Sequence, residues 1–437
     1  MRAIPQRQPL FLGGSIGGVP SFDLNFARGD NAVTKYGFVF TRATSATYVN
    51  STGLIATAAS GELRYTYDPV TLSALGVLIE EARTNLALAS AGIDNATYWT
   101  PTLLTTVSAN GATAPDGTSA ADGLVADASS AVSHRVAAAS AISVSSATQY
   151  TLSVYLKPGN KNYALLSFSG AYPYVGYDLV AGTVTGIGTN TVSASATATL
   201  VGNGWCRCTL TVTTLGTTIS PQIYAYNQSY AGGGSGPTNW AGDAATVNTW
   251  VWGAQFEAGA FPTSYIPTTG TAATRNADVL SLTGAADVIA SWFNKDAGTI
   301  VEKVAAQAST AFASATPVVW IDDGSANNRF GVRTQGGAYN GLYTVRSAGV
   351  AVADQVITAA FAYGVEKTIA YAYAVNDFQA AVNGSLNVPV TSGALPSGLT
   401  TVRIGRDSSA VTFTGTISRI RYYPRRLPNA TLQSLTA

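Results

Sequence analysis

Charged residues are scarce in this chain of 437 residues. Lys, Arg, Asp and Glu make up only 11% of it, against ~25% in ordinary globular proteins. The 24 basic residues are balanced by 23 acidic ones. Binding to nucleic acid depends on basic side chains that displace counter-ions from phosphates, so a nearly neutral surface disfavours it. We therefore expect no DNA or RNA partner.

Histidine and cysteine are almost absent as well. The one histidine, His134, leaves no His-rich zinc site and excludes most catalytic triads. We expect it to face solvent on a strand beside Arg135. Cys206 and Cys208 lie two residues apart in a predicted strand, where side chains share a face without the geometry of a disulfide. We expect two small buried thiols, no metal site, no cofactor, and folding in a reducing cytoplasm.

Long apolar runs and fixed-period repeats are also missing. No run is long enough to cross a bilayer, and the first seven residues lack the apolar region of a signal peptide. We therefore expect no membrane insertion, and assembly in a cytosol. The absence of a repeat argues against a β-helix or a propeller.

What the sequence does have is a strand pattern. Short stretches rich in Val, Thr, Tyr and Ile alternate with Gly, Asn, Asp and Ser at about every ten residues, which is typical of β-sandwiches. One short helix is predicted over residues 78–86, and a linker over residues 267–274. The clearest predicted strands cover residues 151–157, 208–213, 299–304 and 417–422.

The segment from Trp250 to Glu257 reads Trp-Val-Trp-Gly-Ala-Gln-Phe-Glu, with aromatic residues on one face of a strand. Trp205, Trp250 and Trp252 are therefore predicted to lie in a core. Thr-Ser-Tyr-Ile-Pro-Thr (residues 263–268) and Thr-Arg-Asn-Ala-Asp (residues 274–278) follow. With the strands at 151–157 and 204–208, these motifs resemble the carbohydrate-binding-like jelly-roll modules of bacteriophage head-spike and tail-fibre proteins.

The flanking regions extend this resemblance. Residues 22–26, 40–48, 67–69 and 76–86 resemble the segment that precedes such modules in phage spikes. The end of the chain resembles a concanavalin-A or laminin-G type sandwich, with a hairpin turn at Asn383-Gly384, the motif at residues 403–406 and a closing turn of helix.

The resemblance implies an all-β chain with two consecutive antiparallel β-sandwich (jelly-roll) domains after an N-terminal attachment segment. The expected divisions are residues 1–90, 91–270 and 271–437. It also implies a homotrimer at the virion surface, assembled in the host cytoplasm. The N-terminal segment, above all Met1 to Pro20, would bind other virion proteins of the capsid or tail, and the partner outside the virion would be a host-surface polysaccharide.

Aromatic rings that stack on sugars need exposure and nearby polar groups. Two tyrosine-rich segments of the middle region and one tryptophan lie close to Gly, Asn or Gln. Lining a glycan groove and packing on a strand face within a trimer both remain open for them. These candidate glycan-binding residues are Tyr172, Tyr174, Tyr177, Tyr224, Tyr226, Tyr230 and Trp240.

Acidic residues offer weaker candidates. Asp178, Asp243 and Glu257 are possible members of a glycosidase pair, although Glu257 is expected to hold backbone or linker groups instead. Asp322 and Asp323 resemble calcium ligands by type, but their spacing favours a turn.

Arginines gather near the end of the chain, at Arg419, Arg421, Arg425 and Arg426. The first two are expected to share a strand face. A solvated or subunit-facing sheet edge is the favoured interpretation, and an anionic-glycan site is the alternative.

Three functions follow as hypotheses. We expect a virion spike or fibre subunit that recognises host glycans by non-covalent binding and is not an enzyme. A structural spike or decoration protein without a ligand, and a polysaccharide depolymerase, are the alternatives.

Overall fold

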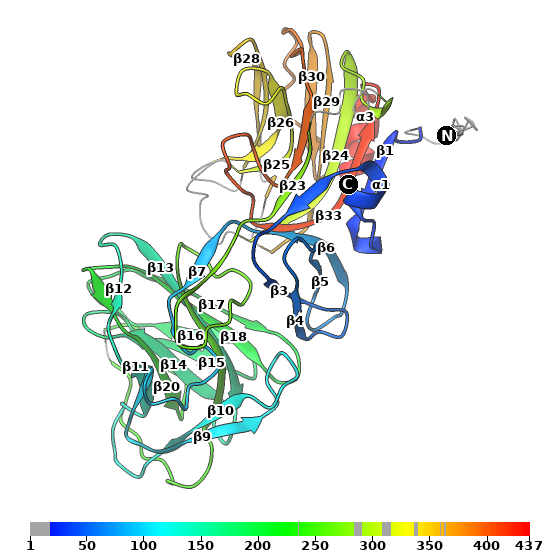
Figure 1. The fold of residues 1–437 in the computed structure, drawn as a ribbon. Coiled ribbons are helices and arrows are strands. Elements are labelled where there is room, and N and C mark those ends of the chain that lie inside the picture. Colours follow the sequence, from blue (N-terminus) through cyan, green and yellow to red (C-terminus); the bar gives the residue numbers. More distant parts are fainter. Residues whose placement is uncertain are drawn as a thin grey trace, which may run out of the picture.

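The computed structural model describes residues 18–234, 236–283, 291–307, 316–335, 340–358, 360–361 and 364–437. It is built almost entirely from antiparallel strands, arranged as two β-sandwiches joined end to end (Figure 1). The predicted all-β fold class is confirmed, and each of the four clearest predicted strands is present. No helix in the described part of the chain is long and apolar enough to span a membrane.

The middle of the chain forms one sandwich of two six-stranded sheets. The first sheet has the order β17 (Ala194–Leu200), β18 (Cys206–Thr213), β13 (Gln149–Pro158), β21 (Thr249–Ala258), β10 (Ala121–Ala126), β9 (Leu104–Ala112). The second has the order β16 (Thr183–Ile187), β15 (Val175–Asp178), β14 (Tyr163–Phe168), β20 (Pro221–Tyr226), β11 (Arg135–Ala138), β8 (Trp99–Thr102). A small ladder joins β12 (Ile142–Ser143) to β19 (Thr218–Ile219).

The core of this middle sandwich follows the alternation of side chains along its strands. Trp205 and Trp252 are each 1% exposed and pack with Tyr155 and Tyr265, which confirms their assignment to a core. Trp250 is only partly buried against the same cluster. The two cysteines are buried and free, with their sulfur atoms 3.8 Å apart, as predicted.

The second sandwich contains an eight-stranded and a seven-stranded sheet. The larger sheet has the order β31 (Ser385–Leu386), β30 (Asp377–Val382), β29 (Lys367–Ala374), β24 (Ala297–Ala306), β33 (Gly415–Tyr423), β6 (Ala74–Ile79), β5 (Tyr65–Tyr67), and β1 (Phe22–Asn25) also pairs with β33. The smaller sheet has the order β2 (Val39–Thr41), β23 (Val279–Thr283), β32 (Thr401–Ile404), β25 (Pro317–Asp322), β26 (Arg329–Thr334), β27 (Gly341–Ser347), β28 (Val350–Ile357).

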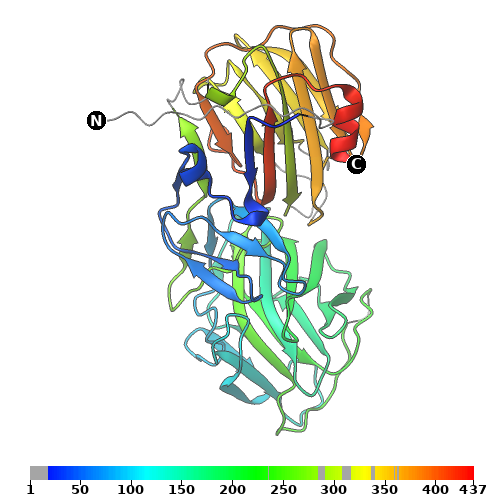
Figure 2. The same ribbon diagram turned by 90° about the vertical axis from the view of Figure 1, so that its right-hand side faces the viewer.

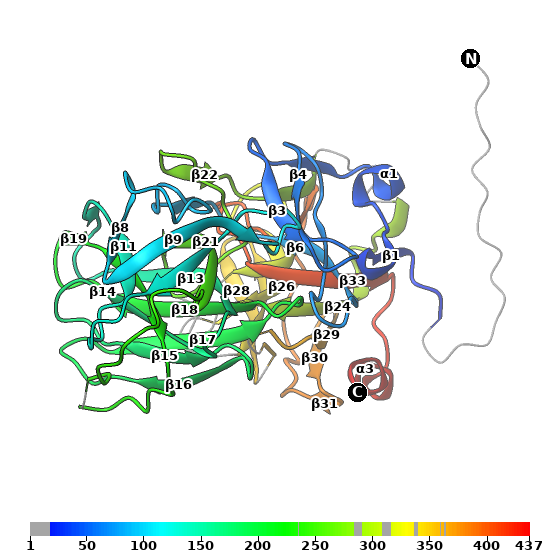
Figure 3. The same ribbon diagram turned by 90° about the horizontal axis from the view of Figure 1, so that it is seen from below.

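Short helical elements accompany the second sandwich. The 3-10 turn η1 (Phe26–Arg28) and the helix α1 (Ala32–Tyr36) follow β1. The closing helix α3 (Asn429–Thr436) lies at the periphery (Figure 3) and packs Leu432 on the outer face of β24, β29 and β30. The predicted closing turn of helix and the hairpin turn at Asn383-Gly384 are both present.

Strands of the N-terminal segment pair with strands of this second sandwich (Figure 2). Strand β1 pairs with β33 in a register that joins Asp23 to Arg421, and β6 joins the same strand farther along. At Gly76, φ is +99°, and a Cβ atom would lie 2.2 Å from the carbonyl oxygen of Ile417. The segment expected as a separate unit therefore supplies strands to both sheets, and the middle sandwich is inserted between β6 and β23. Residues 1–17 of the expected attachment arm lie outside the described residues.

The helix predicted over residues 78–86 is wrong. This stretch forms the end of β6 and the strand β7 (Arg83–Asn85). A short apolar run has no periodicity that separates a buried strand from a helix, and here the neighbouring strand β33 supplies the backbone partners. The predicted linker at 267–274 runs into β22 (Ala273–Arg275), which pairs with β7, so the two crossings between the sandwiches form a ladder.

Candidate functional site

The outer face of the second middle sheet carries a polar groove. Strand register places Arg135 beside Tyr224, and Ala137 beside Gln222 with Ser167 as the next neighbour. Because alternate residues point to opposite faces, Val136 and Ile223 enter the core while Arg135, Gln222 and Tyr224 point outward. The groove has a volume of about 330 Å³ and is lined by Arg135, Ser167, Phe168, Ser169, Gly170, Tyr172, Tyr174, Gln222 and Tyr224.

Aromatic and amide groups form the floor of this groove. The Tyr224 ring is fully buried, and the ring of the half-buried Tyr174 meets it edge-on with centroids 5.5 Å apart. Burial raises the pKa of Tyr224 well above its ordinary value, so its hydroxyl stays protonated and donates to Gln222 Oε1 at 2.6 Å. The floor is thereby held in one arrangement before any ligand arrives.

Arg135 supplies the charge of the groove. Its guanidinium carbon lies 5.6 Å from the centre of the Tyr224 ring, and Nη1 donates to the Tyr224 hydroxyl at 3.3 Å. Among the described residues it forms no ion pair, and its buried Nε has no hydrogen-bond partner. A fixed guanidinium of this kind can take a carboxylate or a row of hydroxyl oxygens.

Most of the candidate glycan-binding rings are buried, so they lack the exposure that stacking on a sugar requires. Tyr177 points into the core and donates to the Thr209 carbonyl at 2.7 Å. Tyr172 is 5% exposed and its hydroxyl accepts a hydrogen bond from the Leu215 amide. Of the candidate rings, only Tyr174 is half-buried. Tyr172 and Tyr224 also line the groove, although they are buried.

The segment that follows β20 explains why the other predicted rings are covered. It folds back over the outer face of β15 and β16, where Thr185 Oγ1 donates to the Tyr230 carbonyl at 2.9 Å. A Cβ atom at Gly186 would lie 2.4 Å from that carbonyl oxygen, so the segment rests directly on the strand. Tyr226, at the end of β20, and Tyr230 and Trp240, on the segment itself, are each at most 6% exposed.

His134 is buried, not exposed as predicted. It precedes β11, and its two ring nitrogens lie 2.7 Å from the Leu103 carbonyl oxygen and 3.1 Å from that of Trp240. Its ring also meets the Trp240 ring, with centroids 4.6 Å apart. The histidine therefore fastens loops beside the groove and does not reach it.

The acidic candidates have structural partners. Asp178 accepts from the amides of Val180 and Ala181, and exposed Asp243 accepts from those of Ala245 and Thr246. Both therefore cap turns.

Glu257 is fully buried and accepts from the amide and the hydroxyl of Thr263, each at 2.8 Å. It holds the backbone after β21, as expected.

The aspartates at the end of β25 also form a turn. Asp322 accepts from the Gly324 amide and pairs with Arg403, and Asp323 accepts from Ser325 and Asn328. Across the described residues, no group of three or more His, Cys, Asp or Glu side chains could hold a metal ion.

The terminal arginines do not lie at a sheet edge, which corrects the favoured interpretation. At Arg419 and Arg421, strand β33 is an interior strand that pairs with β24 on one side and with β1 on the other. Arg419 and Arg421 share its outer face as predicted, and Arg419 pairs with Asp23 through two contacts of 2.9 and 2.6 Å. Arg426 pairs with Asp377 at 2.9 Å.

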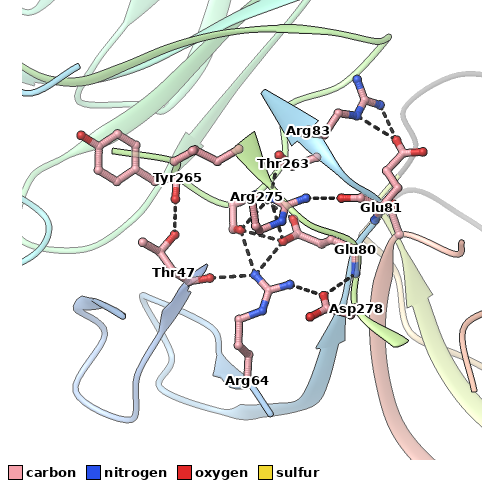
Figure 4. A network of polar contacts seen from close by, with 12 residues as sticks. Thr47, Arg64, Glu80, Glu81, Arg83, Thr263, Tyr265, Arg275 and Asp278 are labelled. Atoms are coloured by element: carbon pink, nitrogen blue, oxygen red, sulfur yellow. Dashed lines mark hydrogen bonds and ion pairs between the residues drawn. The ribbon is translucent and has the colours of Figure 1, made fainter. Parts of the chain in front are cut away.

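A second polar cluster lies where the two sandwiches meet (Figure 4). Arg64 donates to Glu80 at 2.7 Å and also binds Asp278, while Arg275 lies 3.2 Å from the same Glu80 oxygen. Arg42 completes the cluster through Asp278 at 2.9 Å. We call Arg42, Arg64, Glu80, Arg275 and Asp278 the junction network, and each of its side chains is at most 1% exposed.

The junction network ties the middle sandwich to the second one. Glu80 accepts from the Ser264 amide at 2.7 Å and from its hydroxyl at 2.6 Å. Burial alone would raise the pKa of Glu80, but Arg275, Arg64 and the Ser264 hydrogen bonds outweigh it and lower the pKa to about 2. Four of the motifs named above, at residues 40–48, 76–86, 263–268 and 274–278, therefore contribute to this buried ionic cluster. None of the motifs lines the groove.

Sequence reasoning missed Arg135, Gln222 and Ser167 as groove residues. One signal was available: Gln222 is an isolated amide in an otherwise apolar and aromatic strand, which marks an outward position. Nothing local places Arg135 next to it, because that neighbour comes from a strand about ninety residues earlier in the chain.

No protein-family model and no curated protein matches the chain. Among solved structures, it is similar to the Ruminococcus gnavus IT-sialidase CBM40 bound to α2,3-sialyllactose, with 18% identity over 36% of this chain and 93% of that one and a TM-score of 0.31. Domain 4 of AbnA, an extracellular arabinanase from Geobacillus stearothermophilus, in complex with arabinotriose, has 14% identity over 37% and 73% and a TM-score of 0.30. The NanB sialidase of Streptococcus pneumoniae, as its K499G mutant, has 15% identity over 35% and 26% and a TM-score of 0.29. These are distant likenesses over part of the chain, and the function has to be argued from the site.

Proposed function

We propose that the chain recognises host-surface glycans by non-covalent binding in the groove around Arg135. The observation that supports this is a preformed groove lined by the half-buried Tyr174 ring and by the Arg135 guanidinium, which has no ion-pair partner among the described residues. The ring offers a face to the C–H groups of a sugar, and Ser169 and Gln222 offer groups that read hydroxyls.

The charge in the groove favours an acidic sugar. The groove lining contains Arg135 and no carboxylate. A sugar carboxylate would gain charge-assisted hydrogen bonds from the guanidinium, which are stronger than those a neutral hydroxyl makes.

The setting we propose is a virion spike or fibre subunit, because several motifs resemble those of such proteins and follow the same order. In this proposal the subunits form a trimer at the virion surface after assembly in the host cytoplasm, and the N-terminal arm contacts capsid or tail. Several copies on one particle would multiply a weak single-site affinity.

We propose binding without cleavage. A glycosidase needs two carboxyl groups flanking the bond that is cut, and the groove lining contains none. A structural spike without a ligand, and a depolymerase, are the alternatives that an experiment can separate.

The experiment is a titration of the full chain with oligogalacturonate and with its methyl ester, in which a neutral –COOCH₃ group replaces each carboxylate. Arg135→Ala should weaken binding to the acid at least tenfold and leave the ester almost unaffected. The matched control is Arg421→Ala, a half-exposed arginine of the terminal cluster, which should bind as the wild type does. Wild-type affinity in Arg135→Ala, or a loss in Arg421→Ala, would contradict the site.

Incubation with host capsule or lipopolysaccharide then distinguishes the three functions. Retention without cleavage supports binding, shortened products would show an enzyme, and neither result would favour a purely structural role.

A further inference from the structure

A second hollow lies on the N-terminal segment, away from the groove around Arg135. It has a volume of about 340 Å³ and is lined by Asn31, Tyr48, Asn50, Ser51, Glu62, Leu63, Tyr65 and Tyr67. We call it the tyrosine hollow. Its walls come from the residue that caps α1, from β3 (Ala46–Val49) and the turn after it, from the turn before β5, and from β5 itself.

The fold brings the three tyrosines together. Tyr65 and Tyr67 lie two residues apart on β5, so they share a face of the end strand of its sheet. Strand β3, which carries Tyr48, lies beside β5, and the Val49 amide donates to Thr66 Oγ1 at 3.4 Å. The same surface thus receives rings from two neighbouring strands.

Two of these tyrosine rings make no ring contact and no side-chain hydrogen bond in the described part of the chain. Tyr65 packs on the core and its hydroxyl donates to the Asp30 carbonyl at 2.9 Å. Tyr48 and Tyr67 are half-buried, and within the described residues neither contacts another ring nor makes a side-chain hydrogen bond. Partly exposed tyrosines without internal partners are suited to contact a ligand.

The rim of the hollow presents both donors and acceptors. Glu62 Oε2 accepts from the Ala59 amide at 2.8 Å, which fixes the carboxylate and leaves its other oxygen available. Asn31 and Asn50 use their oxygens to cap local turns, which directs their amide NH₂ groups away from those bonds. A carboxylate acceptor and two amide donors around aromatic faces suit a polyhydroxylated ring.

We propose that the tyrosine hollow is a second carbohydrate site, and that it takes a neutral sugar. Glu62 is the only Asp, Glu, Lys, Arg or His in its lining, so an acidic sugar would meet a like charge there. The site needs no contribution from Arg135. A proline-rich peptide could also lie on tyrosine faces, but the carboxylate and amides at the rim favour hydroxyl groups.

The test is a titration of the full chain with neutral oligosaccharides of glucose, galactose and mannose, and with decaproline. We expect at least one neutral oligosaccharide to bind. Tyr48→Ala and Tyr67→Ala should each weaken that binding about tenfold or more, while Tyr48→Phe and Tyr67→Phe, which keep the ring, should retain most of it. Glu62→Gln should weaken it several-fold.

Two controls keep the proposal falsifiable. Arg135→Ala should leave neutral-sugar binding unchanged, and Tyr67→Ala should leave oligogalacturonate binding unchanged. The proposal for each site can therefore be refuted independently of the other. Thermal unfolding should show folded variants, since Tyr48 and Tyr67 are not core residues. Absence of binding to every neutral oligosaccharide, binding that survives both Ala variants, or binding of decaproline in their place would overturn the proposal.

Discussion

Replacing Glu80 by Gln removes one carboxylate from the junction network and keeps the size and shape of the side chain. In the wild type, this carboxylate faces Arg64 and Arg275 and accepts two hydrogen bonds from Ser264. In the variant, the buried guanidinium groups of Arg64 and Arg275 lose the negative charge of this carboxylate. Breaking a buried ion pair from one side costs about 3 to 5 kcal/mol, and we expect a loss of that size in the free energy of unfolding at pH 7.

The pH dependence gives a sharper test of the same network. The pKa of Glu80 falls from 4.5 to about 2 on folding, and a difference of this size corresponds to about 3 kcal/mol. Because the folded-state pKa is lowered, this stabilisation is fully present above pH 4.5 and is lost as the pH falls toward 2. The side chain is fully buried, so solvent screening does not reduce the figure.

Urea unfolding of wild type and Glu80→Gln between pH 7 and pH 2.5 measures this effect. The gap between the two proteins should narrow by about 2 to 3 kcal/mol over the acid range. Burial raises the pKa of Asp122 to about 6, so its protonation makes the folded protein more stable as the pH falls. This effect is the same in both proteins and cancels in the difference between them. Glu366→Gln, which breaks a partly exposed pair with Lys303, is the control and should change stability by less than about 1 kcal/mol. A gap that stays constant from pH 5 to 2.5 would refute the assigned role of Glu80.

Three further substitutions test the packing. Burial raises the pKa of Glu302, to which the Tyr371 hydroxyl donates at 3.5 Å. Because the folded state favours the neutral acid, stability is lost as the pH rises, and Glu302→Gln should restore it; a variant less stable than wild type at pH 8 would contradict this. Trp252→Ala should lower the free energy of unfolding by about 3 to 5 kcal/mol through the cavity it creates, and an unchanged melting temperature would exclude a core role. Gly76→Ala should strongly destabilise the second sandwich, because the added methyl group meets the Ile417 carbonyl. Hydrogen exchange of the β33 amides measures this effect, and unchanged protection in the variant would show that β6 does not pack on β33 as described.

Local chemistry was enough to predict the clearest strands and two of the turns. Alternation of side chains gave β13, β18, β24 and β33 because a half-buried strand has a period of two. The turn at Asn383-Gly384 was predictable because both residues adopt positive φ, at 51° and 71°, which these residue types tolerate. Glu257 was correctly expected to hold backbone groups beyond its strand.

The exposure of the tyrosines could not be predicted in the same way. Alternation tells that Tyr224 and Tyr226 share a face, but it does not tell whether a later segment covers that face. The segment around Tyr230 lies across it, and glycines such as Gly186 permit the close approach. The groove consequently opens beside Arg135, on the part of the sheet that this segment leaves uncovered.

The sequence by itself determined the all-β class and the burial of Trp205 and Trp252 in the core of the middle sandwich. Only the tertiary structure decided which strands pair across the length of the chain, as β1 does with β33. Strand pairing between such distant segments depends on backbone hydrogen bonds that any residue can make, so local sequence does not encode the partner. The same long-range pairing buries Arg64, Glu80 and Asp278 together, and it brings Tyr48 and Tyr67 to one surface.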